Sequence, residues 1–395
     1  MISGDTKILS SHNVLARDAK APAVMQVLPR LEIGGVERGT VDITAALTAA
    51  GRRAVVVSAG GHLVSEIERA GGEHVILPLD SKNPLTMRRN IGALTKIITE
   101  KNVGLVHARS RAPAWSARPA ALRANVPFMT TFHGRYKFNN PPKKAYNAIM
   151  ARGDRVIAIS EFIGRHLSEV YDVPEGRIRI IPRGVDLDEF NPAAVSAERM
   201  IQLSRNWRLP DEAPVIMLPG RLTRWKGHSV LIEAARQLER NDVRVLLVGD
   251  SHGRSGYRAE LEAQIGRSGA EGIIHLTGPC RDMAAAYMLA DVVVSASTDP
   301  EAFGRVAAEA QAMGRPVIAS DHGGARETVI ASETGWLVPP NDAGALALAL
   351  QTALAMTGDE REAVARRAIS HIHEKFTKPQ MCAATLAVYE ELLNK

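Results

Sequence analysis

Two glutamates, Glu301 and Glu309, stand eight positions apart in the second half of the chain. Glu301 lies in a loop before a predicted helix at 305–313, and Glu309 lies about one turn inside that helix. Carboxylates accept hydrogen bonds from sugar hydroxyls, and the N–H groups at the start of a helix bind phosphate. Because the neighbours of Glu309 are small and apolar, we expect its charge to face a ligand. The alternative is a solvated residue on the helix surface.

Two cations, Arg221 and Lys226, follow a predicted strand at 215–218 and precede a predicted helix at 229–239. In such a loop the planar guanidinium of Arg221 and the compact ammonium of Lys226 can together bind a diphosphate. Each cation alone would be an ordinary surface residue, whereas the pair at a strand end is less easily explained in that way. The G-x-x-x-x-G-K-[ST] spacing of a P-loop is absent, which disfavours a P-loop nucleoside triphosphatase.

A glycine pair, Gly34 and Gly35, lies between the first predicted strand and the first predicted helix. Glycines there let the backbone approach a ligand closely, and the helix N-terminus offers N–H groups to a phosphate. The alternative is a tight turn alone. The spacing is not that of a dinucleotide fingerprint, and no acidic residue ends the next predicted strand, which disfavours a nicotinamide-dependent oxidoreductase.

Short apolar runs alternate with amphipathic segments along the chain, which is typical of parallel sheets covered by helices on both faces. The predicted strands are 23–28, 53–58, 74–79, 104–108, 127–132, 155–160, 215–218, 243–248, 273–276, 292–296 and 317–320. The predicted helices are 36–50, 62–70, 84–100, 112–124, 142–151, 161–171, 229–239, 257–268, 282–289, 305–313, 342–356 and 380–393. The pattern loosens over 188–210 and then starts again. The sequence therefore predicts an α/β protein with two doubly wound domains facing each other across a cleft, where ligands bind at the carboxyl ends of the strands.

Composition narrows the class of protein further. Hydrophobic residues make up 45% of the 395 residues and aromatic residues 4%, so the cores must be aliphatic. No apolar run approaches the roughly 20 residues of a membrane-spanning helix, and we expect no signal peptide at the N-terminus. The two cysteines, Cys280 and Cys382, lie far apart in the sequence. They exclude a disulfide scaffold and suit a cytoplasmic protein.

The net charge of +6 is unevenly distributed. Residues 1–190 hold 27 Lys/Arg and 18 Asp/Glu, a net charge of +9, whereas residues 191–395 hold 22 and 25, a net charge of −3. The excess suits either a solvated basic surface or a face for an anionic membrane or a phosphorylated glycan. Nucleic acid would suit the charge, but no nucleic-acid motif accompanies it. The candidate residues for an acceptor or membrane face are Arg109, Arg111, Lys143 and Lys144, interleaved with the aromatic residues Trp115, Tyr136, Phe138 and Tyr146.

The order of the motifs resembles a known family. The motifs are Gly34-Gly35-Val36-Glu37, Arg221 with Lys226, Glu301 with Glu309, Gly314-Arg315-Pro316-Val317-Ile318-Ala319, Gly323-Gly324-Ala325-Arg326-Glu327 and Gly335-Trp336-Leu337-Val338. Together they closely resemble the retaining GT-B glycosyltransferases of family 4 (glycosyl transferases group 1), among them bacterial envelope and lipopolysaccharide enzymes. The resemblance covers nearly the whole chain from Val24 to its end.

The resemblance implies two Rossmann-like domains, one for the acceptor and one for a nucleotide-sugar. It places a flexible N-terminus at 1–22, the acceptor domain at 23–195, the nucleotide-sugar domain at 196–377 and a helix at 378–395 that crosses back to the first domain. It implies His133, Arg221, Lys226 and Glu301 as catalytic residues. It implies that the donor-binding residues are Gly35, Arg221, Lys226, Asp250, Phe303, Gly304 and Glu309.

The implied reaction is transfer of a hexose or similar sugar from a nucleoside diphosphate to a hydroxyl of a glycan or lipid-linked acceptor, with retention. The resemblance implies neither a metal nor another cofactor, and Asp186 and Asp188 of the D-x-D sequence are expected to form a turn. Arg183 departs from the family, which usually has Asn there; this cation either contacts a phosphate or faces solvent. A non-catalytic sugar-nucleotide-binding protein and a GT-B epimerase or phosphorylase stay open, although the two glutamates favour transfer.

Overall fold

The computed structural model describes residues 21–32, 34–251, 253 and 255–394, with Ser255 in its backbone only. The N-terminus that we predict to be flexible, 1–22, lies outside the described residues except for Ala21 and Pro22. The chain divides into two compact units. Unit 1 comprises the residues up to Phe132, Lys137–Ile157 and Cys382–Lys395, and unit 2 comprises His133–Tyr136 and Ala158–Met381. The predicted domain limits at 195 and 377 differ from these and stay a prediction.

The first sheet has, among the described residues, seven strands in the order β3-β2-β1-β4-β5-β6-β7. Its central strand β1 is buried along its whole length, as expected for a parallel strand covered on both faces. Met25 in β1 pairs in parallel with Val55 of β2 and Val106 of β4. The strands are β1 (Ala23–Val27), β2 (Ala54–Ser58), β3 (Glu73–Ile76), β4 (Val103–Ala108), β5 (Phe128–Phe132), β6 (Arg155–Ala158) and β7 (Ile178–Ile180).

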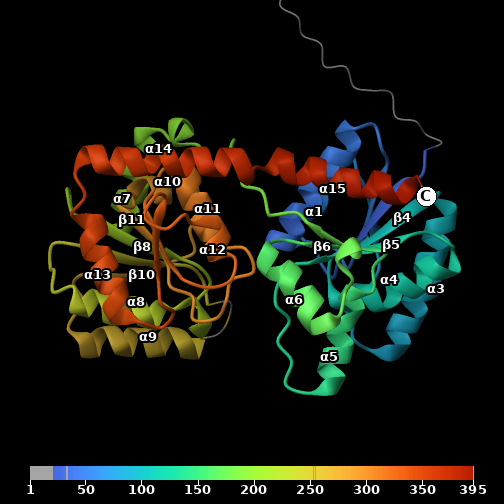
Figure 1. Ribbon diagram of the computed structural model, residues 1–395, viewed down its shortest axis with the longest axis horizontal. Coiled ribbons are helices and arrows are strands. Elements are labelled where there is room, and N and C mark those ends of the chain that lie inside the picture. The colour runs from blue at the N-terminus through green and yellow to red at the C-terminus, as the bar shows by residue number, and fades with distance from the viewer. Residues whose placement is uncertain (1–20, 33, 252, 254, 395) are drawn as a thin grey trace, which may run out of the picture. The chain divides into compact units, whose positions relative to one another are not determined.

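Helices join the strands of this first half, and Figure 1 shows α1 and α4 on different sides of the strands. They are α1 (Gly35–Ala49), α2 (Val64–Arg69), α3 (Pro84–Glu100), α4 (Arg111–Arg123), α5 (Pro141–Asn147) and α6 (Glu161–Tyr171), with 3-10 turns at Ala148–Ala151 and Glu175–Arg177. A core of aliphatic side chains, among them Leu28, Leu31, Val56 and Ile67, lies under α1 and α2.

The second sheet has six strands among the described residues, in the order β10-β9-β8-β11-β12-β13, all paired in parallel. They are β8 (Val215–Pro219), β9 (Arg244–Val248), β10 (Ile274–Gly278), β11 (Val292–Ser295), β12 (Val317–Ser320) and β13 (Gly335–Val338). The helices are α7 (Ala197–Trp207), α8 (His228–Gln237), α9 (Ser255–Ser268), α10 (Met283–Leu289), α11 (Arg305–Ala312), α12 (Ala325–Thr328), α13 (Ala343–Leu354), α14 (Gly358–Lys375) and α15 (Lys378–Leu393), with 3-10 turns at Pro192–Ala194 and Arg224–Lys226.

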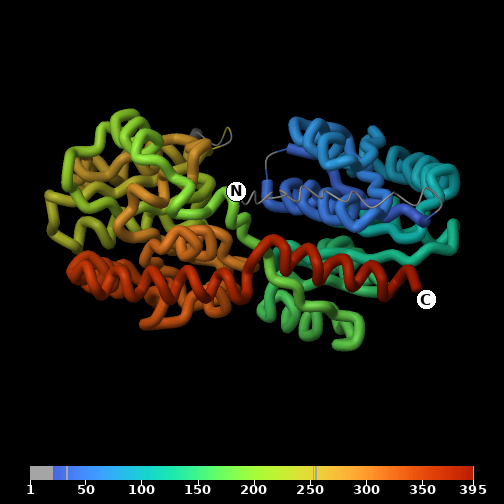
Figure 2. Tube along the Cα trace, turned by 90° about the horizontal axis from the view of Figure 1, so that it is seen from above, coloured from blue at the N-terminus to red at the C-terminus, as the bar shows by residue number. Residues whose placement is uncertain are grey.

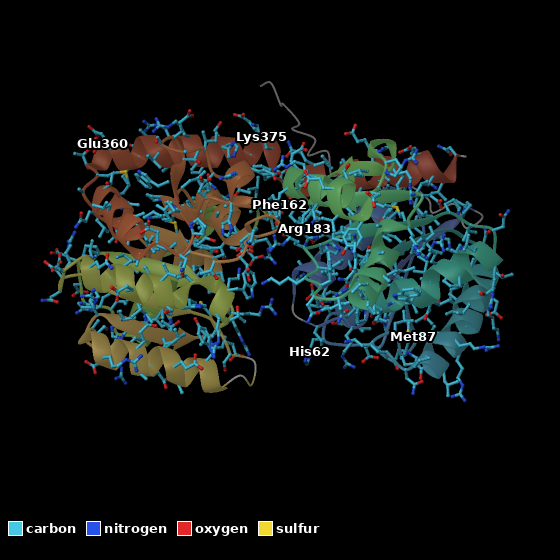
Figure 3. The ribbon with its side chains drawn as sticks, turned by 60° about the horizontal axis from the view of Figure 1, so that its bottom comes forward. His62, Met87, Phe162, Arg183, Glu360 and Lys375 are labelled. Carbon is cyan, nitrogen blue, oxygen red and sulfur yellow. The ribbon has the colours of Figure 1, made fainter. Side chains whose placement is uncertain are left out.

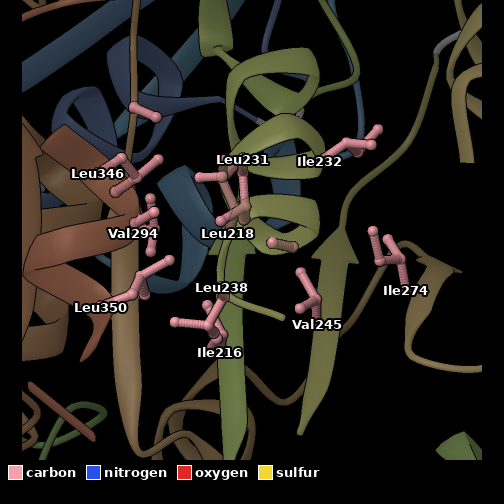
Figure 4. Packing of buried hydrophobic residues seen from close by; sticks show 14 of the residues in the cluster. Ile216, Leu218, Leu231, Ile232, Leu238, Val245, Ile274, Val294, Leu346 and Leu350 are labelled. Atoms are coloured by element: carbon pink, nitrogen blue, oxygen red, sulfur yellow. The ribbon is translucent and has the colours of Figure 1, made fainter. Parts of the chain in front are cut away.

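The core of unit 2 is aliphatic, as the low aromatic content predicts. Leu231 of α8 and Leu350 of α13 pack with Ile216, Val245 and other strand residues in one cluster (Figure 4). Both helices therefore cover the same face of the sheet. Because these side chains are fully or almost fully withdrawn from water, their burial is a main source of the stability of unit 2.

The predicted strands and helices are confirmed, and among the described residues the structure adds five elements, of which α12 (Ala325–Thr328) is the shortest helix. The short strands β7 and β13 were not predicted. The segment expected to be loose, 188–210, contains helix α7, which begins where the Ser196 hydroxyl accepts a hydrogen bond from Arg199 N. Helix α14 was also missed; Glu360 and Lys375 lie near its two ends (Figure 3).

The last helix, α15, fastens its C-terminal part to unit 1, and Figure 2 shows the end of the chain beside the first-half elements. The Tyr389 hydroxyl lies 2.7 Å from Nδ1 of His107 on β4. Arg52 and Arg155 of unit 1 form ion pairs with Glu390 and Glu391. These contacts make the chain end an integral part of unit 1 rather than a free tail.

Candidate functional site

Lys226 lies in the loop after β8, and the backbone of this loop depends on two glycines. Gly220 and Gly227 both have positive φ, and a Cβ on Gly227 would lie 1.8 Å from the carbonyl oxygen of Ala296. No other residue type fits there without moving the backbone. Gly227 is also the residue before α8, so the loop turns directly into the helix.

Lys226 and Glu301 meet in unit 2 across 75 positions of sequence. Lys226 Nζ donates to Glu301 Oε1 at 2.6 Å, and Ser297 Oγ donates to the same oxygen at 2.7 Å. Both charged side chains are 16% exposed, so the pair is shielded from water but reachable. Lys226 Nζ also lies 4.6 Å from the centre of the Trp225 ring, which favours the cation.

The segment from Glu301 to Gly304 is held against a second glycine pair. Gly324 N donates to Glu301 O at 2.8 Å, and a Cβ on Gly324 would lie 2.5 Å from Phe303 Cα. The Phe303 ring is buried and packs edge-to-face on Phe376. Its backbone, rather than its ring, is therefore what this segment offers to a ligand. Gly304 has a φ of 94° and is the residue before α11.

Glu309 has protein partners already, and its predicted role of facing a ligand stays a prediction. It is 8% exposed, and Tyr287 OH donates to its Oε2 at 3.0 Å. Arg305 donates from Nη2 and Nε to Oε1 at 2.6 and 3.1 Å. Burial, reinforced by the Glu309 carboxylate, raises the pKa of Tyr287 well above its usual range, so the phenol keeps its proton and donates. The protein therefore fixes this carboxylate in place without a ligand.

Three other predicted residues, Arg221, Asp250 and His133, lie on loops that follow strands. Arg221 is exposed, and its side chain has no hydrogen bond or ion pair with any residue that the structure describes, although its carbonyl accepts from Thr223 Oγ1. Asp250 is half-buried, and its carbonyl accepts a hydrogen bond from Leu222 N at 3.0 Å. A Cβ on Gly249 would lie 1.9 Å from Gly220 O, so the loops after β8 and β9 touch through glycine. His133 is half-buried and directly follows β5.

One buried histidine beside this loop escaped the sequence analysis. His228, the first residue of α8, is fully buried and packs edge-to-face with Tyr257. Burial, and then the nearby Lys226 ammonium, lower its pKa to about 4. The imidazole is therefore neutral at physiological pH, and it adds no positive charge below the cationic loop. Its only sequence signal is the position after Lys226-Gly227.

Unit 1 corrects one prediction about the basic face. Arg109 directly follows β4 and is only 3% exposed, so it cannot be part of a membrane-facing surface. Arg111 is half-buried, and its Nη1 donates to Asn147 Oδ1 at 2.7 Å. Lys143 and Lys144 on α5 are exposed as expected. The cationic run therefore divides into buried and surface members. Gly35, also in unit 1, is the first residue of α1.

Two further residues of the sequence analysis have structural roles. Asp186 forms an ion pair with Lys378, and its Oδ1 accepts a hydrogen bond from Asp188 N at 3.2 Å, which is the expected turn. Arg183, labelled in Figure 3, is 9% exposed, so it does not simply face solvent. Among the described residues no group of three or more histidine, cysteine, aspartate or glutamate side chains is arranged to hold a metal ion.

Comparison with known proteins settles the family. The model for glycosyl transferases group 1 matches residues 200–371, and the model for glycosyltransferase family 4 matches residues 33–189. The chain belongs to this family of glycosyltransferases. A D-inositol 3-phosphate glycosyltransferase of Xylanimonas cellulosilytica is 34% identical over 292 residues, which cover 70% of this chain and 69% of that protein.

Two solved structures show the same fold. A glycosyltransferase from Rickettsia africae is 37% identical, with a TM-score of 0.88, and the match covers 95% of this chain and 99% of that one. Anabaena HepE in complex with UDP and glucose is 22% identical, with a TM-score of 0.82, covering 94% and 100%. The predicted GT-B class is thereby confirmed, and so is the prediction of a transferase, which removes the oxidoreductase alternative.

Within the described residues, no helix has both the length and the apolar character needed to cross a membrane.

Proposed function

We propose that this glycosyltransferase transfers a hexose or similar sugar from a nucleoside diphosphate to a hydroxyl of a glycan or lipid-linked acceptor, with retention of the anomeric configuration. The observation that carries the proposal is the Lys226–Glu301 pair. It offers a cation to a phosphate and a carboxylate to sugar hydroxyls within one hydrogen-bond length of each other. UDP is the first nucleotide to test, because Anabaena HepE has the same fold and its structure contains UDP and glucose.

Three features of unit 2 support this assignment of roles. Arg221 is exposed and its guanidinium has no partner among the described residues, so this group is available for a diphosphate. The N-terminus of α11, opened by Gly304, lies three residues after Glu301 and favours negative charge. Glu309, held by Tyr287 and Arg305, is a fixed acceptor suited to a ribose hydroxyl.

The chemistry follows from where charge develops. As the bond between the anomeric carbon and the phosphate oxygen breaks, negative charge grows on the departing diphosphate, and Arg221 and Lys226 stabilise it. The acceptor oxygen bonds to the anomeric carbon from the same face, and its proton passes to the departing phosphate oxygen. His133 is proposed near the transferred sugar and Gly35 near the phosphates; Asp250 is proposed at the base. No metal is proposed, so activity should survive EDTA; complete loss with recovery on Mn²⁺ would contradict this.

The decisive experiment is a thermal-shift panel of UDP, GDP, ADP, CMP and NAD. A nucleotide at about a hundred times its dissociation constant adds about 2.7 kcal/mol to the free energy of unfolding. We expect one nucleoside diphosphate to stabilise the protein and Glu309→Gln to weaken that effect. Gln is the better control than Ala, because Glu309→Ala would leave the buried Tyr287 hydroxyl without its acceptor. No shift with any diphosphate would refute the proposed donor class.

A peripheral contact with an anionic membrane on its cytoplasmic side is part of the same proposal, and envelope or lipopolysaccharide saccharides are the proposed acceptors. On α5, Lys143 and Lys144 are exposed, and Lys144 Nζ lies 5.8 Å from the ring centre of Phe138, which is 38% exposed. Tyr146 of the same helix stacks on Trp115 of α4, with ring centres 6.1 Å apart. Exposed cations beside an aromatic ring suit anionic headgroups.

A further inference from the structure

Unit 1 contains a buried cation for which the proposed reaction has no use. Arg109 is 3% exposed, and its Nη1 donates to Gln26 Oε1 at 3.0 Å. Its Nε is buried and has no hydrogen-bond partner, and no carboxylate of the described residues forms an ion pair with it. Burial lowers the pKa of Arg109, but a guanidinium stays charged because its ordinary pKa lies far above neutral pH. A buried charge without an ion-pair partner is costly to keep.

The position of Arg109 in the sheet is the one at which ligands bind in this class of fold. Strands run in the order β3-β2-β1-β4-β5, so the connections that leave β1 and β4 diverge between these two neighbours. Ligands of doubly wound sheets bind at the carboxyl ends of the strands at this point. Arg109 directly follows β4, and its N–H donates to Val27 O at the end of β1.

The N-terminus of α4 lies directly after Arg109 and adds further positive charge. Ser110, the residue before α4, makes no capping hydrogen bond with its side chain, and the first turn carries no acidic residue. The 13-residue helix therefore presents the positive end of its dipole directly after the buried guanidinium. Glu37 and Asp42 on α1 act on Arg109 only at longer range. These carboxylates form no ion pair with Arg109, and the N-terminus of α4 favours an incoming anion.

We propose that Arg109 binds a negatively charged group, phosphate or carboxylate, of the acceptor. The inference rests on the proposed transfer to a glycan and specifies the chemistry of that glycan. A guanidinium binds both groups through paired N–H donors. The structural alternative is that Arg109 only organises the polar cluster that also contains Gln26, His107, Thr131 and Tyr389.

The test measures binding of three small probes in the presence of the nucleoside diphosphate that stabilises the protein most. Glucose 6-phosphate carries a phosphate, glucuronate carries a carboxylate and glucose carries neither. The nucleotide occupies the cations of unit 2, so the probes report a separate site. We expect the wild type to bind one charged probe at least about tenfold more tightly than glucose.

Two variants separate the proposal from the structural alternative. Arg109→Gln should reduce the preference for the charged probe to about twofold or less. Gln26→Glu places a carboxylate where the amide oxygen now accepts from Arg109, so it should neutralise the cation in place and abolish the preference. It also removes the Nε2 donor to Thr40 O and Thr44 Oγ1, so the thermal shift with nucleotide is used to check that this variant folds. Arg135→Gln, at an exposed position, is the matched control and should retain the preference.

Three outcomes would overturn the proposal. They are equal binding of all three probes by the wild type, a full preference in folded Arg109→Gln or Gln26→Glu, and loss of probe binding when the nucleotide is added, since Arg109 would then belong to the donor site. The thermal shift with nucleotide is recorded in the same samples. A retained nucleotide shift without a probe preference refutes only the acceptor subsite, whereas no nucleotide shift refutes the proposed donor chemistry itself.

Discussion

The two units handle buried charge in opposite ways. In unit 2, Glu301 is paired with Lys226 and Glu309 with Arg305, so both carboxylates of the candidate site have a cationic partner before any ligand arrives. In unit 1, the buried Arg109 has neutral partners, the Gln26 amide oxygen and the Tyr389 hydroxyl, instead of a carboxylate. A matched pair fixes geometry, and a ligand must compete with a partner already present. An unmatched cation costs stability and favours an incoming anion.

The largest expected effect comes from breaking the matched pair. Lys226→Ala removes the cation proposed for the diphosphate and leaves Glu301 with the Ser297 hydroxyl as its remaining partner. We expect kcat to fall by about 10²–10³, as when one preorganised donor to a developing charge is lost. Steady-state assays with saturating donor measure this. Arg236→Ala, an exposed cation on α8, should change kcat less than twofold. Equal effects of the two variants would rule out a special role for Lys226.

A second prediction compares buried imidazoles. Burial lowers the pKa of His228 to about 4, and burial also lowers the pKa of His107 in unit 1 well below its usual range. Between pH 6.5 and about 4 the unfolded chain binds a proton at His228 and the folded protein does not. Stability therefore falls as the pH decreases through this window, with His228 contributing up to about 3 kcal/mol.

The readout for this prediction is urea unfolding at pH 7, 5.5 and 4.5. His228→Gln should flatten the decline, whereas His373→Gln, at an exposed position on α14, should leave it as steep as in the wild type. A decline of the same steepness in both variants would mean that other groups, such as His107, dominate the acid sensitivity.

Sequence patterns predicted most of the scaffold because buried parallel strands are short apolar runs. They missed β7, which has three residues, none of them buried, and α7, which buries none of its side chains. β7 is too short to show an apolar period, whereas α7 does carry one, with Met200, Leu203 and Trp207 at helical spacing, although none of these side chains is buried. Helix α14 did carry a signal, the capping box formed by Thr357 and Glu360, and it was overlooked.

The candidate site shows a different limit of sequence reasoning. The types and spacing of Lys226, Glu301 and Glu309 indicated their chemistry. The partners of these residues could not be predicted. Tyr287, for example, is 22 positions from Glu309, and no local sequence pattern indicates that it binds a carboxylate. The burial of individual cations could not be predicted either. Arg109 and Lys143 belong to one cationic run, but only Arg109 directly follows a buried strand.

Tyr287→Phe tests how much the paired state of Glu309 in unit 2 depends on one hydrogen bond, because it removes the hydroxyl that donates to Glu309 and keeps the ring. The loss of a hydrogen bond to a charged group costs about 1.5–3 kcal/mol, shared between the stability of the protein and the positioning of Glu309. We expect KM for the donor to rise about tenfold with kcat nearly unchanged, because the interaction proposed for Glu309 is with the ribose. Tyr257→Phe, also a change of one hydroxyl in this unit, is the matched control. A fall in kcat with unchanged KM would contradict the assignment of Glu309 to donor binding.

The smallest effect concerns the exposed cations of unit 1. If Lys143 and Lys144 contact an anionic membrane, each contributes about 1 kcal/mol, so reversing both charges should weaken sedimentation with phosphatidylglycerol-containing liposomes by at least roughly thirtyfold. Arg236→Glu with Arg267→Glu reverses two exposed charges in unit 2 and should have little effect, because that half of the chain carries no basic excess. High salt should suppress binding of the wild type as well. Unchanged sedimentation of the Lys143/Lys144 variant would identify the excess charge on α5 as a solvated surface and leave Arg109 as the cation through which unit 1 recognises anions.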